Sequence, residues 1–282
     1  MTQLRRSYIR IISVFGFLIS ALSPSIGQNL FDLDHSRKYA DFLFQSQQFS
    51  LAAMEYERLN FMDPDNKIFR KNLIVSYRKS DQYKRGLNRI RNWYGDTLPE
   101  PGIFRELIKL NILENNFNEI TDLLTSTPPI SPSEQNYYRL SSSLLQKDWA
   151  GANKIIGGYP DDSYPGFSEL CALADEQKNI RYKNSALALT LSALVPGLGK
   201  VYSGDWKDGI ISFLFVATNA FQAYRGFSQN GIKSAYGWIF GTLGLGFYAG
   251  NLYGSWKSAS DFNYRAEDKL YHEIENSVYS RF

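Results

Sequence analysis

Apolar residues in the first half of the chain recur with the spacing of short helices that come in pairs. In residues 33–66, Ala40 and Leu43 share one helical face, and Tyr56 and Leu59 share the face of a second helix. Equivalent positions return 34 residues later and again after a further 34, as Ile74, Tyr77, Tyr83, Gly86, Ile90 and Trp93, then Phe104, Leu107, Phe117, Ile120 and Leu124. Each pair must bury apolar surface against its neighbours, so the pattern predicts an all-α helical-repeat solenoid.

The 34-residue period resembles that of the tetratricopeptide repeat over residues 36–180. Pro132 stands where the repeat proline belongs, and a fourth unit is looser, with Trp149 and Ala152 two residues early. The Trp and Gly that the repeat usually carries in its first helix are absent, which leaves a related helical-repeat subtype open. A helix at 166–180 is expected to cap the array. The resemblance implies a concave groove that binds peptides.

A column of basic residues follows the same period, at the fifth position of each first helix, which faces the groove in the repeat family. The column predicts a protein partner with carboxylates, such as an acidic peptide or a C-terminus. The alternative is that these are ordinary solvated helix faces, and Asp34 and Asp41 partly offset the charge. The column consists of Arg37, Lys71, Arg105 and Arg139.

After Asn184 the chain contains three apolar runs without a charged residue. The run 234–256 is long enough to span a bilayer, whereas 209–224 is short unless Arg225 extends toward the headgroups. The first run is broken at Pro196, so 185–198 is either a short span or a re-entrant segment. The pattern predicts a transmembrane helical hairpin in contact with membrane lipid. A very apolar soluble hairpin is the alternative.

Glycines recur at close spacing in the third run, and we expect them to form one stripe on a helix. Small residues four apart let two helices approach closely in a bilayer, either within the hairpin or in a homo-oligomer. In a water-soluble helix, five glycines would cost several kcal/mol at about 1 kcal/mol each. The stripe consists of Gly237, Gly241, Gly246, Gly250 and Gly254.

The segment 194–209, "LVPGLGKVYSGDWKDG", holds a dense glycine motif that we call the glycine corner. A phosphate-binding loop needs Ser or Thr after Lys200, but Val201 follows, and no strand precedes it. The pattern P-G-x-G-x-x-Y-x-G-x-x-x-x-G resembles a bacterial family of membrane hairpin domains related to the two-transmembrane-hairpin domain, over 185–258. The resemblance implies architecture and not chemistry. The matching residues are Pro196, Gly197, Gly199, Tyr202, Gly204 and Gly209.

The N-terminus has the composition of an export signal. Three arginines precede an apolar run at 11–22, and Ser25 and Gly27 are small residues before a cleavage site at Gln28. An uncleaved anchor helix is the alternative. Removing 1–27 takes the formal charge from +3 to zero, so nothing indicates nucleic-acid binding. Cys171 is the only cysteine and is expected to be a buried structural thiol.

Residue types that carry chemistry are scarce. His35 and His272 are the only histidines and lie far apart, so with one cysteine no ordinary zinc site is expected. Neither a Gly-x-Ser-x-Gly nor a His-Glu-x-x-His motif occurs. We therefore predict a protein that is not an enzyme and needs no metal or cofactor.

Together these patterns divide the chain into a signal peptide (1–27), a helical-repeat domain (28–183), a membrane hairpin domain (184–258) and an amphipathic tail helix (259–282). We expect an exported, membrane-anchored adaptor in the cell envelope, in the inner membrane with its repeats in the periplasm. A membrane-protein assembly or insertion factor is the alternative. A small transporter subunit is a third possibility, although the apolar runs lack intramembrane charges.

Overall fold

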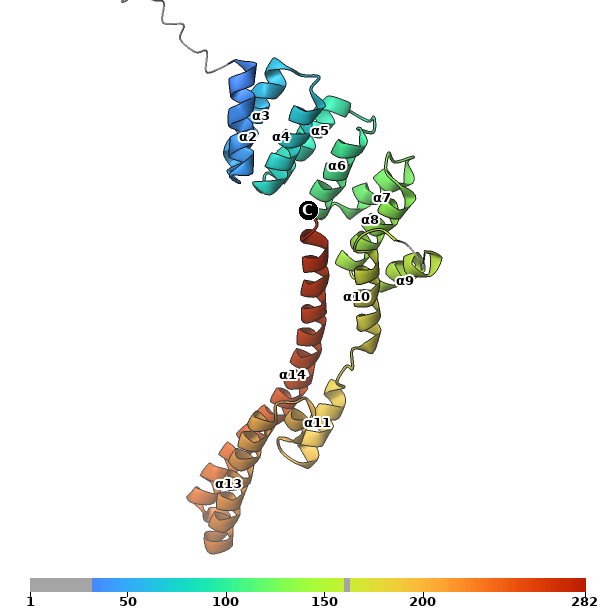
Figure 1. The fold of residues 1–282 in the computed structure, drawn as a ribbon. Helices are drawn as coiled ribbons and strands as arrows, with labels where there is room; N and C mark the ends of the chain where they lie inside the picture. The colour runs from blue at the N-terminus through green and yellow to red at the C-terminus, as the bar shows by residue number, and fades with distance from the viewer. Residues whose placement is uncertain (1–31, 160–162) are drawn as a thin grey trace, which may run out of the picture. The chain divides into compact units, whose positions relative to one another are not determined.

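The computed structural model describes residues 32–159 and 163–282, and within them the chain forms only helices and their connections (Figure 1). The predicted all-α class is confirmed. The predicted signal peptide at 1–27 lies outside the described residues. By its internal contacts the chain divides into two compact units, Met1–Leu110 and Asn111–Phe282, and each is described by itself.

The first unit contains paired helices that pack in a repeat-like manner. Their bounds are α2 Leu33–Gln45, α3 Phe49–Met62, α4 Lys67–Lys79 and α5 Tyr83–Tyr94, with α6 Pro101–Leu113 crossing into the second unit. Buried residues from successive helices form one continuous core, in which Tyr56, Leu73, Tyr77 and Ile90 are almost inaccessible to water.

The turn inside each helix pair repeats the predicted period. A residue in the left-handed conformation ends the first helix, and the N–H after it donates to a carbonyl five residues earlier, at 2.8–2.9 Å. This is the hydrogen bond that closes many helix ends. The left-handed residues are Gln47, Asp81, Asn115 and Lys147, spaced 34, 34 and 32 apart. The fourth unit is therefore two residues short, as the sequence pattern indicated.

The second unit continues the helix pairs and then forms the hairpin. Its helices are α7 Phe117–Thr125, α8 Pro132–Leu145, α9 Trp149–Gly158, α10 Phe167–Asn179, α11 Ser185–Leu194, α12 Leu198–Tyr202, α13 Trp206–Asn230, η1 Gly231–Lys233 and α14 Ala235–Tyr279. The helix expected at 166–180 is present as α10. Helices α13 and α14 pack along each other on either side of η1 (Figure 1).

The predicted tail helix is not separate, because α14 continues through position 258 without a break. Leu270, Ile274 and Val278 are buried where α14 packs against α8 and α10. The Tyr271 hydroxyl donates to the Leu145 carbonyl at 3.2 Å, and Arg281 pairs with Glu169 at 2.8 Å. One helix therefore joins the hairpin to the last repeats.

The prediction of transmembrane helices is not supported. Among the described residues, no helix combines the length and the apolarity required to cross a bilayer. Both α13 and α14 are long, but their apolar residues alternate with glycines and with polar residues such as Asn219, Gln222 and Asn251, which lower the mean hydropathy. The first run is shorter still, because α11 ends at Leu194, before Pro196.

Candidate functional site

Three side chains of the basic column are exposed and the fourth is half-buried. Arg37, Lys71 and Arg105 are exposed on α2, α4 and α6, although Arg37 lies 3.7 Å from the Asp41 carboxylate. Arg139 on α8 is half-buried and donates to the Leu124 carbonyl at 2.6 Å, near the end of α7. Arg139 thus has a structural role in the second unit, which its spacing alone did not indicate.

Lys71 and Arg105 lie on neighbouring helices of the first unit. The Lys71 Cδ atom would lie 3.7 Å from a Cβ added at Gly102, three residues before Arg105 on α6. The aliphatic part of Lys71 therefore packs beside α6, while its ammonium group remains accessible. These two cations form the part of the column that a partner could contact together.

A buried ion pair lies beside this surface and was missed from the sequence. The Arg78 Nε atom is 2.6 Å from a Glu106 carboxylate oxygen, and the two side chains are 6% and 7% exposed. Lys109 approaches the other oxygen of Glu106 at 3.6 Å, and burial lowers the pKa of Lys109. Because the pair joins α4 to α6 across 28 residues, only the packing of the helices could have revealed it.

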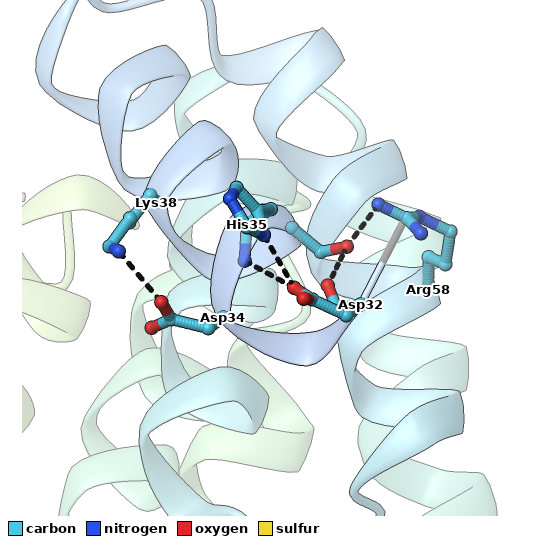
Figure 2. Close-up of polar contacts among 6 residues, drawn as sticks. Asp32, Asp34, His35, Lys38 and Arg58 are labelled. Carbon is cyan, nitrogen blue, oxygen red and sulfur yellow. Dashed lines mark hydrogen bonds and ion pairs between the residues drawn. The ribbon is translucent and has the colours of Figure 1, made fainter. Parts of the chain in front are cut away.

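The N-terminus of α2 is a hydrogen-bonded cap, shown in Figure 2. Asp32 accepts from the backbone N–H of His35 at 2.8 Å, and its Oδ1 atom lies 2.9 Å from the ring Nδ1 atom. The backbone hydrogen bond holds the pKa of Asp32 below its usual value. Arg58 on α3 donates to Ser36 at 2.5 Å and so ties α3 to this turn. His35 therefore serves the helix start, where Asp32 satisfies one of the unpaired N–H groups.

The glycine corner is compact because its glycines leave no room for a side chain. Gly197 has φ +88°, and a Cβ atom there would overlap the Gly209 carbonyl group. A Cβ atom at Gly199 would overlap the Ala188 carbonyl group of α11. Gly204 also has a positive φ, +94°, but no described atom lies within 4 Å of its Cβ position. Two of these glycines therefore allow close packing, and Gly204 allows only the turn.

Polar groups of the corner are satisfied inside the hairpin. The Asn251 Oδ1 atom accepts from the Gly197 N–H, and the Ser192 hydroxyl accepts from the Gly199 N–H, both at 2.9 Å. The hydroxyls of Ser192 and Ser255 lie 2.6 Å apart, and all three polar side chains are buried. The signal for these partners was the i, i+4 pair Asn251 and Ser255 within an uncharged run.

Tyr202, the tyrosine of the motif, contacts the segment that precedes α11. Its hydroxyl accepts from the Asn184 N–H at 3.2 Å, and the Lys183 ammonium lies 4.8 Å from the centre of its ring. Lys183 is itself tied to α14, because Asn263 bonds both its N–H and its carbonyl, at 2.7 and 2.9 Å. The motif tyrosine therefore fixes the segment that leads into the hairpin.

The predicted single glycine stripe is wrong, because the step from Gly241 to Gly246 is five residues. Nine residues turn a helix by about 900°, which places Gly246 roughly opposite Gly237. A Cβ atom at Gly237 would meet the Phe227 ring of α13, and one at Gly241 would make ordinary contacts with Phe227 and Ala223. One at Gly254 would meet the Lys200 side chain. At Gly246 and Gly250 no described atom lies within 4 Å, so these two glycines line an open face.

The hairpin is apolar outside and polar or small inside. Residues buried in it include Gly209, Asn219, Gly237, Asn251 and Ser255. Large apolar side chains point away from it, and Leu214 and Leu245 are 56% and 71% exposed. We call these exposed side chains the apolar belt: Ile210, Ile211, Phe213, Leu214, Phe215, Phe221, Tyr224, Tyr236, Trp238, Ile239, Leu243, Leu245, Phe247, Tyr253 and Trp256.

Within residues 32–159 and 163–282, no three His, Cys, Asp or Glu side chains are arranged to hold a metal ion. The surfaces that stand out are the apolar belt and the two exposed cations Lys71 and Arg105, which we call the groove cations after the groove that the repeat resemblance implies. Comparisons of the chain with protein families, curated proteins and solved structures found no match.

Proposed function

We propose that the protein is a membrane-bound adaptor, in which the apolar belt lies in lipid and the repeats bind a partner protein. The observation that carries the proposal is the inverted hairpin, with Asn251 and Ser255 buried and fifteen large apolar or aromatic side chains exposed. Soluble monomers rarely expose continuous apolar surface of this kind. The belt therefore needs an apolar environment.

Lipid suits the glycine corner of this hairpin because backbone N–H groups there are paired with side chains of the hairpin itself. A segment in hydrocarbon must pair its own N–H and C=O groups, and unpaired groups cost several kcal/mol each. In the glycine corner, Ser192 and Asn251 accept from the N–H groups of Gly199 and Gly197. The proposal places the outer face of the hairpin in lipid and does not require either helix to cross the bilayer.

Flotation of the full chain with phosphatidylcholine vesicles tests the lipid contact. We expect the wild type to float, and Leu214→Asp with Leu245→Asp to lower partitioning at least tenfold, since a charge in lipid costs about 2.5–3.5 kcal/mol. Phe42→Asp with Phe61→Asp is the matched control, because both rings are exposed in the first unit. Equal flotation of both double variants, or a wild type that stays unbound, would reject lipid as the environment of the belt.

The groove cations support the second half of the proposal, a partner that carries carboxylates. Reversing Lys71→Glu with Arg105→Glu should weaken binding of an acidic peptide with a free C-terminus about tenfold and reduce its salt dependence, since exposed pairs contribute about 0–1 kcal/mol each. Helicity and melting temperature should stay near those of the wild type, because both side chains are exposed. Binding can be measured by fluorescence anisotropy.

Lys38→Glu with Lys67→Glu is the control for the groove test, since both are exposed cations of the first unit outside the column. Unchanged peptide affinity in the groove variant would show that the column is ordinary surface. Loss of helicity in that variant would instead show that Lys71 and Arg105 hold the repeats together.

A further inference from the structure

The outer face of α5 is strongly basic. Tyr83–Tyr94 contains four cations and no carboxylate, and residues 65–96 contain nine Lys or Arg against three Asp. Lys84, Arg85, Asn88, Arg91 and Asn92 are all exposed along α5, and we call them the α5 basic face. Every polar group that these five side chains offer is a cation or an amide.

Contacts with α3 and α4 hold part of this face in place. Arg85 and Arg89 both approach the same Glu57 oxygen, at 3.3 and 3.2 Å, and the Tyr77 hydroxyl donates to it as well. The Arg85 guanidinium also lies 5.2 Å from the centre of the Tyr77 ring. Burial raises the pKa of Tyr77 to about 12, so this hydroxyl stays a neutral donor. The Glu57 carboxylate therefore faces the guanidinium groups of both Arg85 and Arg89, so this cluster keeps a net positive charge.

The opposite face of α5 is already used inside the solenoid. Ile90 is buried in the core, and a Cβ atom added at Gly86 would come within 2.9 Å of Leu110. The helix therefore cannot turn to bury its basic face. Arg91 has no ion-pair partner among the described residues. Like charges along one helix repel each other, so folding alone does not favour this composition.

We propose that the α5 basic face binds the anionic headgroups of a phospholipid membrane. This inference rests on the proposed function, because a hairpin in lipid keeps the repeats near headgroups. Basic amphipathic helices are typical of membrane surfaces. Here the apolar side is occupied by protein, so the contact is electrostatic and without insertion.

A headgroup surface fits this face better than an acidic peptide does. The exposed side chains extend from Lys84 to Asn92, about 12 Å along a single helix. A layer of phosphates and carboxylates can contact all of them at once. A single exposed helix face can attract an extended peptide by its charge but cannot enclose it on two sides. The groove cations Lys71 and Arg105, by contrast, lie on two adjacent helices, α4 and α6. Each cation near an anionic membrane should contribute about a fivefold change in binding.

The test uses the full chain with Cys171→Ser and a fluorescent label at Asn88→Cys, reconstituted into vesicles that contain a headgroup spin label. We expect quenching to be strong with added phosphatidylserine, weak with phosphatidylcholine alone, and lost in high salt, where the screening length falls to about 3 Å at 1 M. Lys84→Gln with Arg91→Gln should lower the bound-to-free ratio of α5 about 25-fold. Lys67→Gln with Lys154→Gln removes the same charge elsewhere and should leave quenching unchanged.

Three outcomes would overturn the inference. Quenching could be independent of phosphatidylserine, or equal in the two double variants. Polyglutamate in solution could also bind the face as tightly as anionic vesicles do, which would identify an acidic peptide as the ligand. Flotation with phosphatidylcholine vesicles measures only the contact of the hairpin with lipid, so a protein that does not float rejects the proposed function. Quenching that does not depend on phosphatidylserine rejects only the role of α5.

Discussion

Gly197→Ala should disrupt the glycine corner and expose the chain around Lys200 to protease. The backbone there has φ +88°, and the new methyl group would overlap the Gly209 carbonyl group. A left-handed alanine costs about 1–2 kcal/mol and overpacking about 1–3 kcal/mol, so we expect a loss of about 3 kcal/mol. The rate of tryptic cleavage after Lys200, in the full-length protein in detergent, measures the opening of the corner.

Gly204→Ala and Gly250→Ala are the controls for this substitution. Gly204 has a positive φ of +94° but open space around it, so alanine should cost only the strain, about 1 kcal/mol. Gly250 lies in a helix with no described atom near its Cβ position, so alanine should stabilise α14 by up to about 1 kcal/mol. If Gly197→Ala and Gly204→Ala open the corner equally, close packing of its backbone is not what holds it.

Glu106→Gln should lower the free energy of unfolding of the first unit by about 3 kcal/mol or more. The substitution keeps the shape of the side chain but leaves the Arg78 guanidinium, 6% exposed, without a counter-charge. Arginine cannot escape by losing its proton. Urea denaturation followed by circular dichroism measures the effect, and the change should be confined to one of the two unfolding transitions if the units unfold separately.

Asp34→Asn breaks an exposed pair with Lys38 and should change stability by no more than about 1 kcal/mol. The double substitution Arg78→Met with Glu106→Met should recover part of the stability lost in Glu106→Gln, because the two buried charges of the pair are removed together and only Lys109 loses its carboxylate. A Glu106→Gln variant as stable as Asp34→Asn would show that water reaches this pair and that the helices do not depend on it.

The repeats could be predicted because their signal is local and periodic. Small and aromatic residues 34 apart fix where each helix lies, and the left-handed turn residues Gln47, Asp81 and Asn115 follow the same period. The irregular fourth unit could also be predicted from the sequence, because Trp149 comes two residues earlier than the 34-residue period requires. The left-handed turn residue Lys147 comes two residues early as well. Helix periodicity within one segment was enough for these features.

Features that depend on how helices meet could not be predicted in the same way. The pairing of Arg78 with Glu106, and the bond from Arg139 to the Leu124 carbonyl, join different helices. The glycine pattern of the third run was read as one stripe, although the five-residue step to Gly246 places it on the far side of α14 from Gly237. From the sequence, the residues of the apolar belt could be recognised only as apolar runs. The structure shows which side of the hairpin they occupy, because Asn251 and Ser255 are buried inside it and the belt side chains are exposed.

The unbroken helix α14 couples the hairpin mechanically to the last repeats. Its 45 residues extend over about 67 Å. Asn251 is fixed at the glycine corner, and Leu270 and Ile274 are fixed against the repeats. An α-helix resists twisting about its axis. A rotation of the hairpin about the axis of α14 should therefore also rotate the C-terminal end of that helix. A rotation of the hairpin can therefore reach α8 and α10 through α14, without a flexible linker between them.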